Sequence, residues 1–260
     1  MEEDIRADGA ESARIKSYSV GTTSYACIAH SLNDVVTDAD RANADRPLDP
    51  DIDTTEGLTD KIRLRREYAQ GSYLFNTTTF AGHTNALTGT ACWDDYANSH
   101  PVKDVEVQKG DVQKEIGLEA NTVIIGREVY DVLKQHPDIL DRVKYTTKGV
   151  VTAELLATLF QVDRVLVGSA IYNSANEGQA ASTTRIWGKY ALMCYVTPKP
   201  ALKSPALGYT YQQKIWGNNG WKVKKWRREE LDGDEIEVST AYDVKLLCPS
   251  AGYLLSTVIS

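Results

Sequence analysis

Apolar and polar positions alternate most regularly between residues 121 and 167, and this part of the chain predicts a unit of mixed strands and helices. The β-branched run Thr122–Ile125 predicts a strand, which Gly126 ends. The residues that follow place three apolar side chains at the spacing i, i+3 and i+4, which puts them on one face of a helix: Val129, Val132 and Leu133.

The second half of this unit is predicted from its breaker and capping residues. Pro137 ends the first helix, because the residue before a proline is pushed out of the α region. Thr152 is a candidate N-cap for a second helix, whose apolar stripe is Leu155, Leu156, Leu159 and Phe160. A short strand is then expected over Val162–Val167.

Two further helices are predicted upstream of this unit. The longer begins at Thr54 or Thr55 and continues to about Asn76, with acidic residues in its early turns and arginines later, an order that suits the helix dipole. Gly57 and Gly71 weaken the helical pattern. A second helix is expected over Asp104–Leu118. Residues 34–53, which are acidic and contain two prolines, predict a loop, and residues 76–103 predict an irregular region.

Strand patterns dominate both ends of the chain. Near the N-terminus, Ser17–Val20 and Tyr25–Ala29 predict a hairpin around a turn at Gly21, and such a hairpin is stable only against another surface. Beyond the small, polar loop 169–182, Ile186–Val196 predicts a buried strand region. Three strand-like segments then occupy residues 209–247 and predict an antiparallel sheet.

Composition and charge exclude several classes of protein. The chain has 260 residues, with 42% hydrophobic and 25% charged residues, as in folded domains, and a net charge of −7 that argues against a general nucleic-acid binder. No apolar run approaches the roughly 20 residues of a membrane span. The charged N-terminus lacks the pattern of a secretory signal. The four cysteines are far apart and are interpreted as buried or half-buried free thiols: Cys27, Cys92, Cys194 and Cys248.

No stretch has the spacing of a catalytic or metal-binding motif. Asp94 and Asp95 are adjacent, so their side chains point in different directions and do not form a catalytic pair. The four histidines are scattered, and His136, which precedes Pro137, is interpreted as a residue that acts at a helix end. We therefore assign no catalytic, cofactor-binding or metal-binding residue and expect no cofactor and no enzymatic activity.

Two basic stretches are the candidates for contacts with other molecules: Arg63–Arg66 of the predicted long helix, and a segment near the C-terminus. The segment Trp221–Arg228 combines basic and aromatic residues, as in surfaces that hold single-stranded nucleic acid, but Glu229 and Glu230 partly cancel its charge. A structural strand with one charged face, an intersubunit contact and a DNA contact remain open for it. The candidates for intersubunit contacts in both stretches are Arg63, Arg65, Arg66, Trp221, Trp226, Arg227 and Arg228.

Several segments, in the same order, resemble the major capsid proteins of tailed bacteriophages, which have the HK97-like fold. They are NTVIIGREVYDVLKQHPDILDRVKYT, VLVGSAIYNSANEG, IWGKYALMCYV and VKLLCPSAGYLL. The resemblance implies an α+β fold with five segments: an extended loop over residues 1–33, a peripheral domain with a spine helix over 34–115, an axial domain over 116–208, peripheral return strands over 209–247 and an axial return over 248–260. Members usually carry an N-terminal arm before the extended loop, and this chain starts almost at the loop.

The resemblance implies a structural protein that assembles with copies of itself. It predicts pentamers and hexamers in an icosahedral shell around double-stranded DNA, formed in the bacterial host cytoplasm. Portal, scaffolding and decoration proteins are the other expected partners, and no membrane is expected. The alternatives are a shell protein of an encapsulin-like nanocompartment, which carries enzyme cargo, and, from a different class, a soluble α/β enzyme or a DNA-binding protein.

Overall fold

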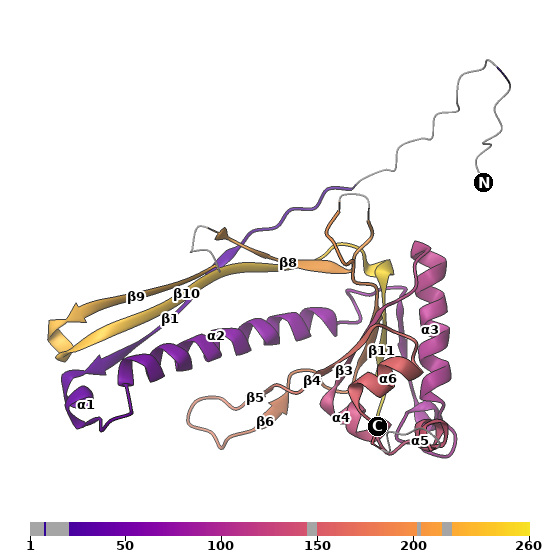
Figure 1. Cartoon of the computed structure of the whole chain (residues 1–260), viewed down its shortest axis with the longest axis horizontal. Coiled ribbons are helices and arrows are strands. Elements are labelled where there is room, and N and C mark those ends of the chain that lie inside the picture. The colour runs from indigo at the N-terminus through magenta and orange to yellow at the C-terminus, as the bar shows by residue number, and fades with distance from the viewer. Residues whose placement is uncertain (1–7, 9–20, 145–149, 202–203, 215–219) are drawn as a thin grey trace.

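The structure consists of a long arm joined to a compact unit, and Figure 1 shows both along their length. It is a computed structural model that describes residue 8 and residues 21–144, 150–201, 204–214 and 220–260. The arm has one long helix against an antiparallel sheet, and the compact unit has a second sheet with shorter helices around it. This combination confirms the predicted α+β class.

The arm sheet is built around β10 (Gly233–Leu246), a strand of 14 residues. On one side, β10 pairs antiparallel with β1 (Ile28–Thr37) along the whole of that strand. On the other side, it pairs with β9 (Trp221–Arg228) near its start and with β8 (Gly208–Gln212) near its end. One strand therefore holds every other strand of this sheet, and the three strands predicted over residues 209–247 are confirmed.

The long helix α2 (Pro50–Leu74) runs along one face of the arm sheet (Figure 1). Its N-cap is Asp49, whose side chain accepts hydrogen bonds from the backbone N–H groups of Asp51 and Ile52. Pro50 is the first helical residue, where the N–H that proline lacks would have no partner within the helix. The predicted helix is confirmed, and this cap explains why it begins before Thr54. A buried cluster joins helix and sheet: Val36, Leu58, Ile62, Ile236 and Val238.

The compact unit has five strands in the order β2-β11-β7-β3-β4. The parallel pair β3 and β4 and the central β7 bury side chains that form one large core with the surrounding helices. The strands are β2 (Thr84–Ala86), β3 (Thr122–Gly126), β4 (Arg164–Gly168), β7 (Ala191–Cys194) and β11 (Gly252–Ser256). The helices are α3 (Pro101–Ile116), α4 (Arg127–Leu133), α5 (Pro137–Val143) and α6 (Ala153–Leu159).

The remaining elements are short. The helix α1 (Asp38–Asn43) follows β1 directly, and the strands β5 (Ile171–Asn173) and β6 (Thr183–Arg185) form a separate hairpin below α2 in Figure 1. Among the described residues, single-turn 3₁₀ helices are η1 (Gly89–Ala91), η3 (Glu229–Leu231) and η4 (Pro249–Ala251). None of the helices among the described residues is both long enough and apolar enough to cross a bilayer.

Most of the elements predicted in the central unit and α3 are confirmed, including Thr152, which caps α6 by accepting from the N–H of Leu155. The first helix of this unit, α4, ends before Pro137 as predicted, but Pro137 also begins a helix, α5, that was not predicted. The short strand expected over Val162–Val167 is confirmed with shifted bounds: β4 begins two residues later, at Arg164, and ends one residue later, at Gly168.

Two predictions from the sequence are wrong, and the bounds of a third change. The segment 34–53 is not a loop. Its first residues pair with β10 and extend β1 to Thr37, and the rest contains α1, capped by Thr37, and the start of α2, capped by Asp49. The segment 169–182 is not a plain loop, because β5 pairs with β6. The strand Tyr25–Ala29 becomes the start of β1 at Ile28, and it pairs with β10; its predicted partner Ser17–Val20 lies outside the described residues.

Two glycines decide how the compact unit meets the arm. Gly126 and Gly168 pair with each other at the ends of β3 and β4, and the chain at Trp187-Gly188 crosses directly over both. A Cβ on Gly126 would lie 1.9 Å from the carbonyl oxygen of Gly188, and one on Gly168 would lie 2.1 Å from the Trp187 ring. Glycine is therefore required at both positions, since any side chain would displace this crossing segment.

The crossing segment also fastens the compact unit to the arm. Trp187 donates its indole N–H to Glu67 of α2 at 2.6 Å, and its ring lies edge-on to Phe75 just beyond the helix. Tyr190 stacks on the other side of Phe75, with 5.1 Å between ring centroids. A close contact also explains Gly71 in the last turn of α2, because a Cβ there would lie 2.8 Å from the Cγ2 atom of Ile186.

We expect the substitution Gly126→Ala to lower the free energy of unfolding by about 3 kcal/mol, because backbone atoms of Gly188 must move to admit the methyl group. Chemical denaturation would measure the change. The control is Gly57→Ala in α2, where no atom lies within 4 Å of the new Cβ, and alanine should stabilise the helix by about 0.5–1 kcal/mol. Equal effects of the two substitutions would contradict the assignment.

Candidate functional site

The arm presents far more surface than its own core can cover. Its sheet packs on α2 through the small cluster around Ile62 and Val238, whereas the compact unit has a much larger core. Figure 1 shows α2 along one face of the sheet and no helix of the described chain along the other. Both outer strands, β1 and β9, pair with β10 alone among the described residues, so each has one open edge. Open edges and uncovered faces are surfaces on which other chains bind.

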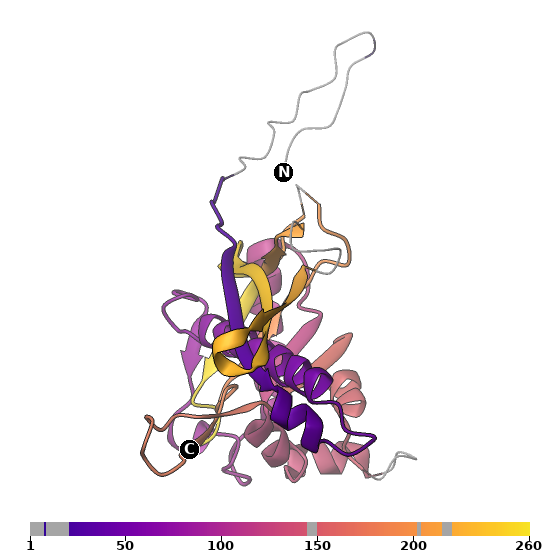
Figure 2. The ribbon, with the colours of Figure 1, turned by 90° about the vertical axis from the view of Figure 1, so that its left-hand side faces the viewer.

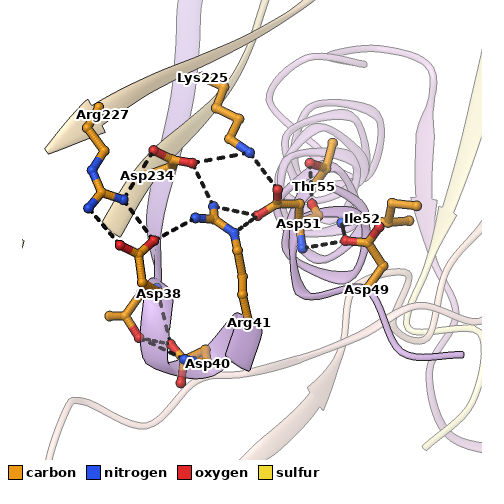
Figure 3. A network of polar contacts seen from close by, with 11 residues as sticks. Asp38, Asp40, Arg41, Asp49, Asp51, Ile52, Thr55, Lys225, Arg227 and Asp234 are labelled. Carbon is orange, nitrogen blue, oxygen red and sulfur yellow. Dashed lines mark hydrogen bonds and ion pairs between the residues drawn. The ribbon is translucent and has the colours of Figure 1, made fainter. Parts of the chain in front are cut away.

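A network of ion pairs holds the far end of the arm together (Figure 3). Arg41 of α1 contacts Asp51 at 2.8 Å, Asp234 at 2.9 Å and Asp38 at 3.2 Å. Lys225 of β9 joins the same carboxylates, at 2.5 Å from Asp51 and 3.3 Å from Asp234. The network therefore connects α1, α2, β9 and β10.

Arg227 completes this network through a bidentate contact. Its two terminal nitrogens donate to the two carboxylate oxygens of Asp38 at 2.8 and 2.6 Å. Hydrogen bonds from Arg227 hold the pKa of Asp38 below its ordinary value of 3.8, and hydrogen bonds from Lys225 and Arg41 do the same for the pKa of Asp51. Three cations and three carboxylates are thus matched within the arm.

The three arginines of α2 predicted as contact residues do not share one face of the helix. Arg63 lies over the ring of Trp221 at 5.9 Å and near Asp60, whereas Arg66 lies over the ring of Tyr242 at 5.4 Å. Arg65 lies over Tyr68 of the same helix at 5.4 Å. Arg63 and Arg66 therefore lie against the sheet side of the helix, and the intersubunit role of all three stays a prediction.

The basic segment of β9 is largely matched by carboxylates of its own chain. Register places Trp226 opposite Glu235 and Arg227 opposite Asp234 on β10. Arg228 contacts Glu235 at 3.3 Å, and Trp221 packs against the arm core. These contacts favour the structural interpretation of the segment over DNA binding, while contacts to another subunit through Trp226 and Arg228 stay a prediction.

Sequence analysis missed Arg41, Asp51 and Asp234, which form the centre of the network. Arg41 and Asp51 lie in the segment predicted as a loop, and 174 residues separate Asp51 from Lys225. Two capping signals in this acidic segment pointed to helices: the capping box at Thr37 and Asp40, and the N-cap Asp49 before Pro50.

A buried serine and histidine meet in the compact unit, and their hydrogen bonds identify a structural pair. His136 is 1% exposed, and its Nδ1 accepts from the backbone N–H of Asp138, which confirms the predicted action at a helix end. The ring proton is therefore on Nε2 and is donated to Ser99 Oγ at 2.9 Å, and Ser99 donates in turn to the carbonyl of Asp95. A histidine that donates to the serine does not act as its base.

Comparisons with known proteins agree with the resemblance found in the sequence. No family model matches the chain. The major capsid protein of Burkholderia phage BcepMu is 31% identical over 205 residues, which are 77% of this chain and 64% of that protein. The chain therefore spans less than two thirds of the length of this relative.

Solved structures agree on the fold. A phage-related protein from Bordetella bronchiseptica is 27% identical and superposes with a TM-score of 0.74. The superposition covers 90% of this chain and 77% of that chain. A chain of the capsid of Cyanophage P-SCSP1u is 11% identical and superposes with a TM-score of 0.57. That superposition covers 95% of this chain and 80% of that chain. The chain thus has the HK97-like fold of phage capsid proteins, as the resemblance implied.

We expect Arg41→Met to lower the free energy of unfolding by about 1–2 kcal/mol, because three carboxylates lose their shared partner while solvent screens part of the loss. The pKa values of Asp38 and Asp51 are depressed, so the network stabilises the fold above about pH 4 and is lost as the pH falls further. Denaturation at pH 7 and pH 3 would measure both effects. Lys114→Met, at an exposed pair on α3, is the control and should change little.

We expect stability to fall as the pH drops below about 6.5, because burial lowers the pKa of His136 and the unfolded chain takes up a proton first. The loss has an upper limit of about 1.4 kcal/mol per pH unit. Unfolding of the variant His136→Gln between pH 7 and pH 5 should show a smaller slope than that of the unsubstituted protein. An unchanged slope in His136→Gln would contradict this assignment.

Proposed function

We propose that this chain is a major capsid subunit, which assembles with copies of itself into the icosahedral shell around the double-stranded DNA of a tailed bacteriophage. The observation that carries the proposal is the arm, in a chain with the HK97-like fold: a 25-residue helix and a four-stranded sheet that share a core of a few side chains. Surfaces of this kind are stable in a lattice of neighbours, where many weak, identical contacts act together.

The domain assignment follows from the same fold. In this proposal, the arm is the peripheral domain, with α2 as its spine helix, and the compact unit is the axial domain. The extended loop expected over residues 1–33 lies for the most part outside the described residues. Pentamers and hexamers use one set of contacts in slightly different surroundings. In this proposal, the contact between Trp187 and Phe75 keeps the peripheral and axial domains together in both.

The proposed work of this subunit is association and includes no chemical step. Its place is the capsid of the virion, after assembly in the bacterial host cytoplasm. Portal and scaffolding proteins, and in some shells decoration proteins, are the other partners in this proposal. The basic residues of β9 that are paired inside the arm, such as Lys225 and Arg227, are not available to hold DNA strongly by counterion release.

We expect the purified protein at high concentration to form shells, sheets, or rings of five or six subunits. Electron microscopy with size-exclusion chromatography would measure this, and the shell diameter would then limit the number of copies. Nucleic acid recovered from shells formed in cells would support a phage capsid, whereas a co-purifying enzyme would indicate a nanocompartment. A monomer at every concentration, also with a scaffolding protein present, would contradict the proposal.

A further inference from the structure

A hollow of about 490 Å³ lies between the long helix and the small hairpin below it. Four residues of α2 line one side, and residues 172–174 of the β5 segment line the other: Lys61, Leu64, Arg65, Tyr68, Tyr172, Asn173 and Ser174. The rings of Tyr68 and Tyr172 meet edge-on at 4.9 Å and close one end. The hollow is therefore formed by two elements that are far apart in the sequence.

The chemistry of this hollow is basic at two points and apolar between them. Within the described part of the chain, neither Lys61 nor Arg65 has a carboxylate at ion-pair distance, in contrast to the matched cations of the arm end. Leu64 is 37% exposed at the same place. A partner that fits would offer carboxylates beside an apolar side chain on a narrow element.

The turn between β9 and β10 has this combination. It contains η3 and the residue after it, with the sequence Glu229, Glu230, Leu231 and Asp232. Leu231 is 48% exposed, and the side chain of Glu229 is 85% exposed. The turn lies at the end of the arm, at the left in Figure 1 and facing the viewer in Figure 2.

The turn cannot reach the hollow of its own chain. Lys225 of β9 is bound to Asp51, which fixes this end of the sheet at the beginning of α2. A helix rises about 1.5 Å per residue, so Lys61 and Tyr68 lie roughly 16 and 27 Å further along the helix than Pro50. The occupant must therefore come from a second copy of the chain.

We propose that the β9–β10 turn of one subunit binds in the hollow between α2 and the β5–β6 hairpin of a neighbouring subunit. Carboxylates of Glu230 and Asp232 meet Lys61 and Arg65, while Leu231 packs on Leu64 and the tyrosine rings. This contact joins two different surfaces, and such heterologous contacts close rings when the rotation between copies allows it. The inference rests on the proposed function, because it names one of the contacts through which the subunits associate.

Cysteine substitution tests the contact directly. A Leu64→Cys variant and a Leu231→Cys variant are mixed, oxidised mildly and separated without reductant. We expect a disulfide-linked dimer from the mixture, and a ladder of larger oligomers from a chain that carries both substitutions. The matched control pairs Leu231→Cys with Leu140→Cys, a leucine on α5 that is 42% exposed. A dimer yield no higher than that of the control pair would overturn the contact.

Charge reversal tests the chemistry of the contact. Lys61→Glu with Arg65→Glu in the Leu64→Cys partner, or Glu230→Lys with Asp232→Lys in the Leu231→Cys partner, should each lower the dimer yield at least fivefold. Reversal on both partners at once should restore it. Reversal at Lys114, on α3, should leave the yield unchanged, and so should added double-stranded DNA. Equal yields in all combinations would contradict the charge pairing, and competition by DNA would indicate a phosphate site.

Assembly of the unsubstituted protein separates this inference from the proposed function. Shells or rings by electron microscopy, together with no disulfide-linked dimer, would overturn the contact and leave the capsid function in place. A dimer that depends on both charge sets would support the contact whether or not complete shells form. Absence of both would remove the contact and the proposed function together.

Discussion

The pairing of β10 with β1, β8 and β9 builds the arm sheet and gives α2 the surface on which it packs. The 14 residues of β10 hold β1 on one side and β9 and β8 in succession on the other. Ile236 and Val238 of the same strand face α2 and provide the small core of the arm. Without β10, neither the sheet nor the helix would have a surface to lie on, because a lone helix or hairpin is marginally stable in water.

The division of stabilising interactions between the two parts of the chain agrees with a subunit whose arm is completed by neighbours. The compact unit is held by a large apolar core, whereas the far end of the arm is held by ion pairs around Arg41 and Asp51. Half-exposed ion pairs contribute little each, but pairs that share partners, as around Arg41, add to the stability and hold α1, α2, β9 and β10 together. Such an end keeps its shape while its turn and edges stay open for contact with another chain.

The two parts are joined by close approach of backbone and aromatic rings. Gly126 and Gly168 let the Trp187-Gly188 segment cross the ends of β3 and β4, and Trp187 then reaches Glu67 on the arm. The same helix carries Lys61 and Arg65 to the hollow beside the β5–β6 hairpin. One spine thus connects the core of the compact unit with the surface that the proposed contact uses.

Local patterns in the sequence predict the long helix, α3, the N-cap Thr152 and the three strands of residues 209–247, because each has a periodicity or a cap, whereas the α+β class is implied by the resemblance to phage capsid proteins. The tertiary structure places residues 34–37 in β1 by pairing them with β10, although they belong to the acidic segment predicted as a loop; Val35, Val36 and Thr37 themselves favour a strand. The tertiary structure also decided the partners of Arg41, Lys225 and Arg227, as 189 residues separate Asp38 from Arg227. Periodicity indicates which face of an element is buried. The pairs between distant charges, and the hollow beside α2, form only after the strands have paired in register, so no local pattern predicts them.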